Sequence, residues 1–240
     1  MIKVALVGTG KMGELIRQKI EDTDGICFVG AMDPMNPEAA HSLIQLGSSD
    51  VIIDFSHPDN LKSIGAYAEK HRVPLVIATT GFSNDQILYI KKLAENMPVV
   101  YTANCSLGIT VLTKVLEEIG QVLSQDFDIE IIEKHHNKKL DAPSGTAKML
   151  AAAVDPHKEY DQNFGRSGNG RREKEIGIHA VRGGNIVGEH TVIFAGEDEI
   201  LELTHKAGSK QIFANGALKA ALFAVDQPPG LYDMNDVLFG

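Results

Sequence analysis

A short apolar run followed at once by closely spaced glycines constrains the fold of this chain more than any other feature. Residues 2–7 (IKVALV) have the length and composition of a strand covered on both faces. Gly8, Gly10 and Gly13 follow as G-x-G-x-x-G, and a helical pattern continues to about residue 21. Glycines allow a tight turn and let the backbone approach an anion that the helix N-terminus attracts. The segment therefore predicts a strand, loop and helix that bind a dinucleotide.

An acidic residue lies at the position where such a unit needs one. Asp33 ends the next strand-like run, 20 residues after Gly13, where its carboxylate would accept hydrogen bonds from a ribose diol. The alternative is a glycine turn followed by a surface Asp, but the order of strand, loop, helix and acid favours dinucleotide binding. The predicted loop contacts are Gly8, Thr9, Gly10, Lys11, Met12 and Gly13.

Strand-like runs recur along the first half of the chain, at residues 27–33, 50–56, 73–81 and 98–104. Helix-like segments separate several of them, which predicts an α/β fold with an N-terminal Rossmann-type parallel sheet. Ligands of such sheets bind at the carboxyl ends of the strands. Further cofactor-binding candidates are therefore Ala78, Thr79, Thr80, Thr102, Ala103, Asn104 and Cys105. For Cys105, packing is favoured over a nucleophilic role because no base lies near it in the sequence.

The pattern changes after Asn104 and predicts a second, α+β domain. A helix-like stretch at 109–123 leads into strand-like runs at 128–136, 175–183, 185–196 and 199–208, expected to form a mixed, largely antiparallel sheet. Residues 155–174 show no periodicity and predict a mobile surface loop. The expected domains are 1–105 with 216–240, for the dinucleotide, and 106–215, for substrate binding and oligomerisation.

Composition limits the possible partners. The net charge of −9 argues against nucleic acid and anionic membranes, which bind basic surfaces. No apolar run approaches the roughly 18 residues of a membrane helix, and the N-terminus lacks a signal-peptide pattern. Cys27 and Cys105 show no metal or redox spacing, so we expect no disulfide and a cytoplasmic location.

The most informative stretch is residues 133–147, EKHHNKKLDAPSGTA. Its first seven residues hold three Lys and one Glu, a local positive excess in an acidic chain. Ser144 can cap a helix whose first amides would face an anion, so a carboxylated small molecule is the expected ligand. Adjacent histidines are a poor metal pair, because helical zinc ligands usually lie at i, i+4, and no metal is expected. Histidines that merely end a strand would leave Lys139 and the helix start unexplained.

This stretch resembles the E-x-H-H-x-x-K-x-D-A-P-S-G-T-A signature of dihydrodipicolinate reductases. The resemblance extends over nearly the whole chain, through the glycine loop, ATTGF at 78–82, VGEHTVIF at 187–194, ELTHKA at 202–207, FANGALKAALF at 213–223 and the closing GLYDMNDVL. It implies that His135 is the catalytic acid/base and Lys139 the proton donor. It implies that the substrate carboxylates are held by His136, Ser144, Gly145 and Thr146. Lys210, where the family often has Arg, is implied to bind the distal carboxylate, without the bidentate fork of Arg.

By the same resemblance, the chain reduces the dehydrated imine of 4-hydroxy-tetrahydrodipicolinate to tetrahydrodipicolinate with NADH or NADPH, in diaminopimelate and lysine biosynthesis, as a homotetramer. Asp33 suits a ribose diol and would repel a 2′-phosphate, and Pro34 and Met35 follow it with no Arg, which favours NADH at least as much as NADPH. Lys11, which stands where Arg is usual, is the residue that would support NADPH binding. Another two-domain amino-acid dehydrogenase is an alternative, but it gives no reason for residues 133–147. A non-catalytic sensor of the dinucleotide's reduction state is a second alternative.

Overall fold

The computed structural model describes all residues, 1–240, and divides the chain into two compact units. Unit 1 comprises Met1–Leu107 and Lys210–Gly240, and unit 2 comprises Gly108–Ser209. The expected second boundary, at residues 215/216, falls inside helix α6 (Gln211–Val225). The division precedes this helix because α6 packs along its whole length in unit 1, where Ala214, Ala217 and Ala221 are buried in the core.

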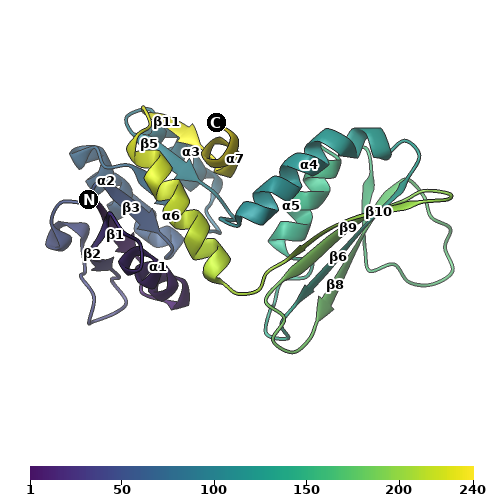
Figure 1. Cartoon of the computed structure of the whole chain (residues 1–240), viewed down its shortest axis with the longest axis horizontal. Helices are drawn as coiled ribbons and strands as arrows, with labels where there is room; N and C mark the ends of the chain where they lie inside the picture. The colour runs from purple at the N-terminus through teal and green to yellow at the C-terminus, as the bar shows by residue number, and fades with distance from the viewer. The chain divides into compact units, whose positions relative to one another are not determined.

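Unit 1 contains a parallel six-stranded sheet in the order β11-β5-β4-β3-β1-β2 (Figure 1). The strands are β1 (Ile2–Val7), β2 (Ile26–Met32), β3 (Val51–Asp54), β4 (Leu75–Ile77), β5 (Pro98–Tyr101) and β11 (Gly230–Tyr232). The helices are α1 (Lys11–Glu21), α2 (Leu61–His71), α3 (Asn84–Ala94), α6 and α7 (Met234–Phe239), with short 3-10 turns at Leu43–Leu46 and Pro58–Asn60.

Both faces of this sheet are covered, which explains the continuous apolar runs. In β1, Val4 and Leu6 belong to the core that contains α1 and α6, whereas Ala5 and Val7 belong to the core that contains α2 and α3. Alternate residues of a strand face opposite sides of a sheet, so a strand covered on both faces is apolar at successive positions. The expected Rossmann-type sheet is confirmed. The strands end several residues earlier than expected, because the polar residues after 54, 77 and 101 form loops.

Unit 2 contains a five-stranded sheet in the order β10-β9-β6-β8-β7, with helices α4 (Leu107–Leu123) and α5 (Gly145–Val154) (Figure 1). Its strands are β6 (Asp128–His135), β7 (Asp161–Phe164), β8 (Glu175–Arg182), β9 (Glu189–Ala195) and β10 (Ile200–Lys206). The sheet is mixed, as expected. Its antiparallel share is smaller than expected, because β6–β8 and β7–β8 are parallel and only β10–β9 and β6–β9 are antiparallel.

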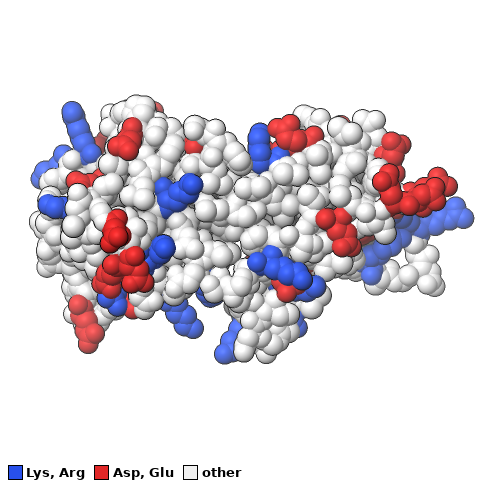
Figure 2. Space-filling model, in the orientation of Figure 1, with Lys and Arg blue, Asp and Glu red and all other residues white.

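The segment expected to be a loop contains a strand. Within 155–174, β7 pairs with β8, and Asn163 donates to Glu175 at 2.8 Å. Its sequence, DQNF, lacks the apolar alternation of a strand, and only the long-range pairing with β8 orders it. Figure 2 shows acidic and basic side chains interspersed over the visible face of each unit. None of the helices is both long enough and apolar enough to cross a membrane.

Candidate active site

The buried face of the unit 2 sheet changes from apolar to polar at the carboxyl end of β6. Ile129 and Ile131 are buried in the core with α4 and α5, and the next two positions on that face are Glu133 and His135. On the neighbouring strand β9, His190 lies opposite Glu133 and is also buried. Buried polar groups require hydrogen-bond partners, so this end of the sheet is a constructed polar site.

Glu133 is fully buried and accepts four hydrogen bonds. Both terminal nitrogens of Arg182 donate to it, each at 2.7 Å, and Arg182 lies in register with His135 on the parallel strand β8. His135 contacts the same carboxylate through Nδ1 at 2.6 Å, and the backbone amide of Ser144 donates at 2.9 Å. One carboxylate therefore joins β6, β8 and the start of α5.

Burial and the contact between Glu133 and His135 shift the pKa of each of these two groups in opposite directions. Burial raises the pKa of Glu133, but the hydrogen bonds from Arg182, His135 and Ser144 outweigh it and leave the pKa below its ordinary value. Burial lowers the pKa of His135, and although Glu133 opposes this, the net shift is downward, with Lys139 and Arg182 adding to it. The two net shifts leave Glu133 ionised and His135 mainly neutral at pH 7.

Ser144 and His190 continue the polar site toward α5. The Ser144 hydroxyl caps α5 by accepting from the amide of Ala147 at 3.1 Å, and it lies 3.1 Å from Nε2 of His190. The rings of His190 and His135 meet edge to face, with centroids 5.1 Å apart. Burial first, and then His135, lower the pKa of His190 to about 4. His190 is therefore a neutral structural neighbour of His135.

Lys139 lies in the loop between β6 and α5 and forms an ion pair. Its ammonium is 2.8 Å from Oδ1 of Asp141. Lys139 lowers the pKa of Asp141, and the backbone amide of Gly145, at the start of α5, contributes to that shift by donating to the same carboxylate. A side-chain carboxylate thus binds both to Lys139, the predicted proton donor, and to the α5 N-terminus, which the sequence predicts for a substrate carboxylate.

The other predicted substrate ligands belong to both units. His136 follows β6 directly, and its buried Nδ1 has no hydrogen-bond partner. Thr146 occupies the first turn of α5. Lys210 is exposed and precedes α6 in unit 1. Unit 2 therefore brings together His135, Ser144 and the start of α5.

The predicted dinucleotide loop in unit 1 has the close contacts that require glycine. Gly8 has a φ of 100°, and a Cβ on it would lie 2.4 Å from the carbonyl oxygen of Phe55. A Cβ on Gly13 would lie 2.2 Å from the carbonyl oxygen of Gly8. A Cβ on Gly10, by contrast, would meet nothing within 4 Å, and α1 begins there without a side-chain cap. The open space beside uncapped helix amides fits a pyrophosphate.

Asp33 lies beside this loop. Its Oδ2 accepts from the amide and the hydroxyl of Thr9, at 3.0 and 2.7 Å, and Oδ1 accepts from the amide of Met35. Partial burial raises the pKa of Asp33, but these hydrogen bonds outweigh it and the pKa lies below its ordinary value. An ionised carboxylate next to the glycine loop fits a ribose diol, so the residues present are suited to a pyridine nucleotide.

The other predicted cofactor residues lie at the carboxyl ends of β4 and β5. Ala78 and Thr79 are buried, and the Thr79 hydroxyl accepts from the amide of Ser56 at 2.8 Å. Thr80 and Ala103 are exposed, whereas Thr102 exchanges hydrogen bonds with the backbone of Asn104. The Cys105 thiol is buried, and burial raises its pKa to about 12, which agrees with a packing role.

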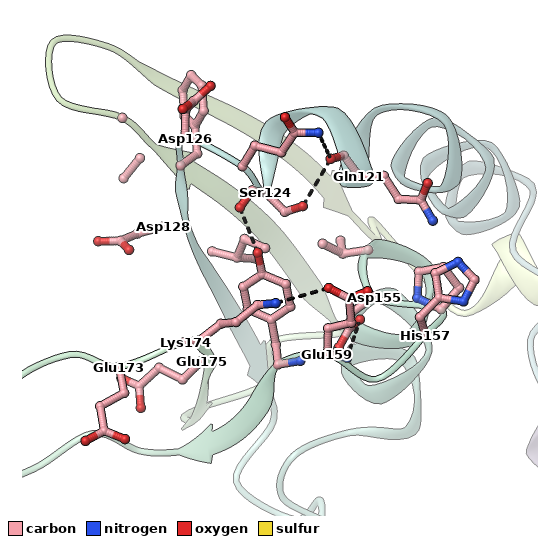
Figure 3. A pocket seen from close by; sticks show the side chains of 18 of the residues that line it. Gln121, Ser124, Asp126, Asp128, Asp155, His157, Glu159, Glu173, Lys174 and Glu175 are labelled. Atoms are coloured by element: carbon pink, nitrogen blue, oxygen red, sulfur yellow. Dashed lines mark hydrogen bonds and ion pairs between the residues drawn. The ribbon is translucent and has the colours of Figure 1, made fainter.

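A pocket of about 970 Å³ lies at the other end of the unit 2 sheet, around the start of β6 (Figure 3). Its walls include seven carboxylate side chains, those of Asp126, Asp128, Asp155, Glu159, Glu173, Glu175 and Glu197. Lys174 points to Glu159, with which it forms an ion pair at 3.0 Å (Figure 3). This acidic surface would repel a dicarboxylate, so the candidate site is the cationic end of the sheet, where Lys139, Arg182 and the α5 N-terminus lie.

Two family models match the chain almost from end to end. Residues 2–105 match the model "Dihydrodipicolinate reductase, N-terminus", and residues 108–238 match "Dihydrodipicolinate reductase, C-terminus". The chain belongs to the dihydrodipicolinate reductase family. The two models divide it between residues 105 and 108, next to the first crossing between the two units.

Relatives within the dihydrodipicolinate reductase family agree over their full length. The chain is 44% identical to 4-hydroxy-tetrahydrodipicolinate reductase of Clostridium novyi, covering 99% of this chain and 98% of the relative. It is 43% identical to the same enzyme of Clostridium tetani, covering 99% and 97%. A solved structure, dipicolinate-bound dihydrodipicolinate reductase from Paenisporosarcina sp. TG-14, superposes with a TM-score of 0.82 at 25% identity and covers 100% of both chains.

Sequence reasoning named no role for three residues of the polar site: Glu133, Arg182 and His190. A signal for Glu133 was present, because the alternation of residues 128–135 places it on the apolar face, where an unpaired carboxylate is costly. Arg182 and His190 lie 49 and 57 residues farther along the chain than Glu133, and no local pattern links them to it. Only the pairing of β8 and β9 with β6 brings them together.

Proposed function

We propose that this protein reduces the dehydrated imine of 4-hydroxy-tetrahydrodipicolinate to tetrahydrodipicolinate, an oxidoreductase step in diaminopimelate and lysine biosynthesis. The observation that carries this proposal is the cationic end of unit 2, where Glu133 contacts His135 and the Ser144 amide and Lys139 pairs with Asp141 next to the α5 N-terminus, in a chain of this family. A dicarboxylate suits this end, because Lys139 and the amides at the start of α5 can bind carboxylates and the His135 ring can transfer a proton.

The residues of the glycine loop are proposed to bind the pyridine nucleotide, which supplies a hydride when bound. The amides at the start of α1 would meet its pyrophosphate, with the open side of Gly10 allowing close approach. Asp33 would accept from a ribose hydroxyl while Thr9 holds its carboxylate in place.

The residues after β6 are proposed to hold the substrate and to deliver the proton. A substrate carboxylate would replace Asp141 on Lys139 and on the amide of Gly145. His136 and Ser144 are assigned to carboxylate binding, and Lys210 to the distal carboxylate. The negative charge of the bound substrate would raise the pKa of His135 and oppose the effect of burial, so the imidazolium would form when the substrate is present. His135 and Lys139 are then the two groups that can donate a proton to the reduced ring.

A coupled assay tests the activity directly. The preceding synthase would generate the unstable substrate from pyruvate and aspartate semialdehyde, and loss of reduced nicotinamide absorbance would be followed. Turnover that requires both the synthase and this protein supports the proposal. Binding of NADH without turnover would instead favour the non-catalytic sensor.

NADH is proposed to serve at least as well as NADPH. Asp33 is ionised beside the glycine loop and would repel a 2′-phosphate, and Pro34 and Met35 provide no compensating cation. Lys11, exposed at the start of α1, is the one nearby cation in the loop. Measurement of kcat/KM for both cofactors checks this prediction, and a strong NADPH preference would contradict it.

A cytoplasmic homotetramer is proposed as the working form. The support is a pair of exposed apolar side chains on one face of the unit 2 sheet: Val181 on β8 and Ile200 on β10 are 45% and 66% exposed, on the face opposite to Ile129. Strand β10 is also a sheet edge, and edges left uncovered tend to pair with other chains. Packing of this surface against other copies of the chain would remove the apolar side chains and the strand edge from water.

A further inference from the structure

The carboxylate of Glu133 has all its acceptor positions occupied, in a place where a carboxylate is expensive. It is fully buried on the face of β6 that otherwise carries Ile129 and Ile131. The bidentate contact with Arg182, at 2.7 Å for each pair, compensates its charge. The desolvation cost of such a buried ion pair is large and offsets much of its attraction, so the pair adds little to the free energy of unfolding.

The first consequence concerns the protonation of His135. An ionised carboxylate is only an acceptor, so the 2.6 Å contact with Glu133 places a hydrogen on Nδ1 of the ring. The neutral ring then carries its lone pair on Nε2. That atom lies 3.1 Å from where a Cβ of residue 188 would be, and Gly188 leaves the space open. Nε2 is therefore the atom through which His135 can exchange a proton with a ligand.

The second consequence concerns the start of α5. The other oxygen of Glu133 accepts the Ser144 amide at 2.9 Å, and Ser144 caps the helix whose first residues are Gly145 and Thr146. The same carboxylate thus sets the position of the His135 ring and of the α5 N-terminus. A substrate that is bound at one and protonated at the other needs this relation to be constant.

We propose that Glu133, anchored by Arg182, is the positioning residue of the active site, which holds His135 in its Nδ1–H tautomer and keeps the α5 N-terminus in register with it. This role rests on the proposed reductase activity. Glu133 touches no reacting atom and acts through His135 and Ser144. Arg182 acts in turn through Glu133, and it also donates to the carbonyl oxygen of Asp141 at 2.5 Å.

The charged and titratable groups that face His135 come from several elements. Glu133 lies on β6, the strand of His135, and Arg182 and His190 lie on β8 and β9. Lys139 lies in the loop that leads to α5. His205, on β10, lowers the pKa of His190. Glu133 is the only anion among them. Its removal should lower the pKa of His135, so the loss of kcat with rising pH should move to lower pH.

The chain offers a matched control three residues earlier on the same strand. Glu130 also bonds one Arg and one His, with Arg172 and with Nε2 of His179, the latter at 2.8 Å. It lies on the opposite face of β6 and contacts none of the site residues. Glu130→Gln therefore removes the same charge from the same type of cluster without touching His135.

The test compares Glu133→Gln with Glu130→Gln. Glu133→Gln should lower kcat by roughly 10²-fold, as for a mispositioned general acid, shift the pH profile to lower pH and weaken binding of dipicolinate. Glu130→Gln should leave kcat and its pH profile unchanged. Arg182→Lys, which keeps the charge but not the fork, should fall between wild type and Glu133→Gln. Equal losses in the two Glu variants would overturn the positioning role.

A measurement on the wild-type protein guards against variants that fail to fold. Nitrogen NMR of histidine-labelled protein, with His135→Gln to assign the signal, should show His135 as the Nδ1–H tautomer. An Nε2–H tautomer would overturn the proposal. Neither this measurement nor dipicolinate binding depends on turnover. Absence of turnover in the wild type would contradict the proposed function alone.

Discussion

At the scale of single residues, this site depends on polar groups placed where the strand pattern calls for apolar ones. Glu133, His135 and His190 occupy buried positions of β6 and β9, and each has a charged or polar neighbour from another element. Burial changes the pKa of the two imidazoles in the same direction, downward. The proposed difference in role between His135 and His190 rests on Glu133, which contacts only His135 of the two.

Substitution of the proposed proton donors should separate chemistry from binding. His135→Ala and Lys139→Ala should each lower kcat by roughly 10²- to 10⁴-fold and leave NADH affinity nearly unchanged, because both lie in unit 2 and the glycine loop lies in unit 1. His136→Ala should mainly raise KM, because the carboxylate that it is proposed to hold is equally charged throughout the reaction. Steady-state kinetics and NADH titration check this. Near-native kcat in the first two variants would contradict the assigned roles.

His190 should make stability depend on pH. Its folded pKa, about 4, lies below that of an unfolded histidine, so the unfolded chain binds more protons between pH 6.5 and 4. Stability should therefore be unaffected by this group above pH 6.5 and should decrease as the pH falls toward 4, by at most about 3 kcal/mol.

Urea unfolding at several pH values measures this effect. His190→Gln should show a flatter dependence than wild type in that window. The exposed His157 provides a matched control, His157→Gln. If His190→Gln and wild type show the same dependence, the buried neutral state of His190 is wrong.

At the scale of elements, the strand–loop–helix unit of β1 and α1 must fold and is proposed to bind a nucleotide, and different glycines serve these two purposes. Gly8 and Gly13 are needed for the chain to fold, since a Cβ on either would lie within 2.4 Å of a backbone oxygen. Gly10 has open space where its side chain would be, so the folded chain itself does not need a glycine there.

These glycines predict opposite phenotypes. Gly13→Ala should lower the thermal midpoint, because the new Cβ would overlap the Gly8 carbonyl oxygen at 2.2 Å. Gly10→Ala should preserve the midpoint but weaken nucleotide binding, because the methyl group would occupy the space proposed for the pyrophosphate. Thermal unfolding and NADH titration of both variants test this. Unaltered NADH affinity in Gly10→Ala would place the pyrophosphate elsewhere.

At the scale of the whole molecule, the two units carry different parts of the proposed reaction on different kinds of sheet. The parallel sheet of unit 1 is covered on both faces, whereas unit 2 leaves apolar side chains exposed on β8 and β10. Exposed apolar groups on a sheet that ends in an edge strand are a reason for association between chains.

Light scattering should give a mass near four times the 26.0 kDa of one chain. Ile200→Glu should lower this mass, because a charge would be buried in the proposed interface. Leu88→Glu, at a leucine on α3 that is also exposed, is the matched control and should leave the mass unchanged. A monomeric wild-type protein would contradict the tetramer.

The sequence alone was enough to predict those elements whose formation depends on residues close together in the chain. The apolar run of residues 2–7 and its glycines predict β1, the loop and α1, because a doubly covered strand and a helix start each have a local signature. The family resemblance in residues 133–147 is confirmed by the family models. The assignment of individual site residues stays a prediction.

Only the tertiary structure decided how the polar site is completed. Arg182 reaches Glu133 across 49 residues and His190 reaches Ser144 across 46, because the register of β8 and β9 on β6 places them there. The same long-range pairing makes a strand of residues 161–164, whose composition predicts a loop. The physical reason is that sheet register and the compensation of a buried charge depend on groups far apart in the chain, which no local periodicity encodes.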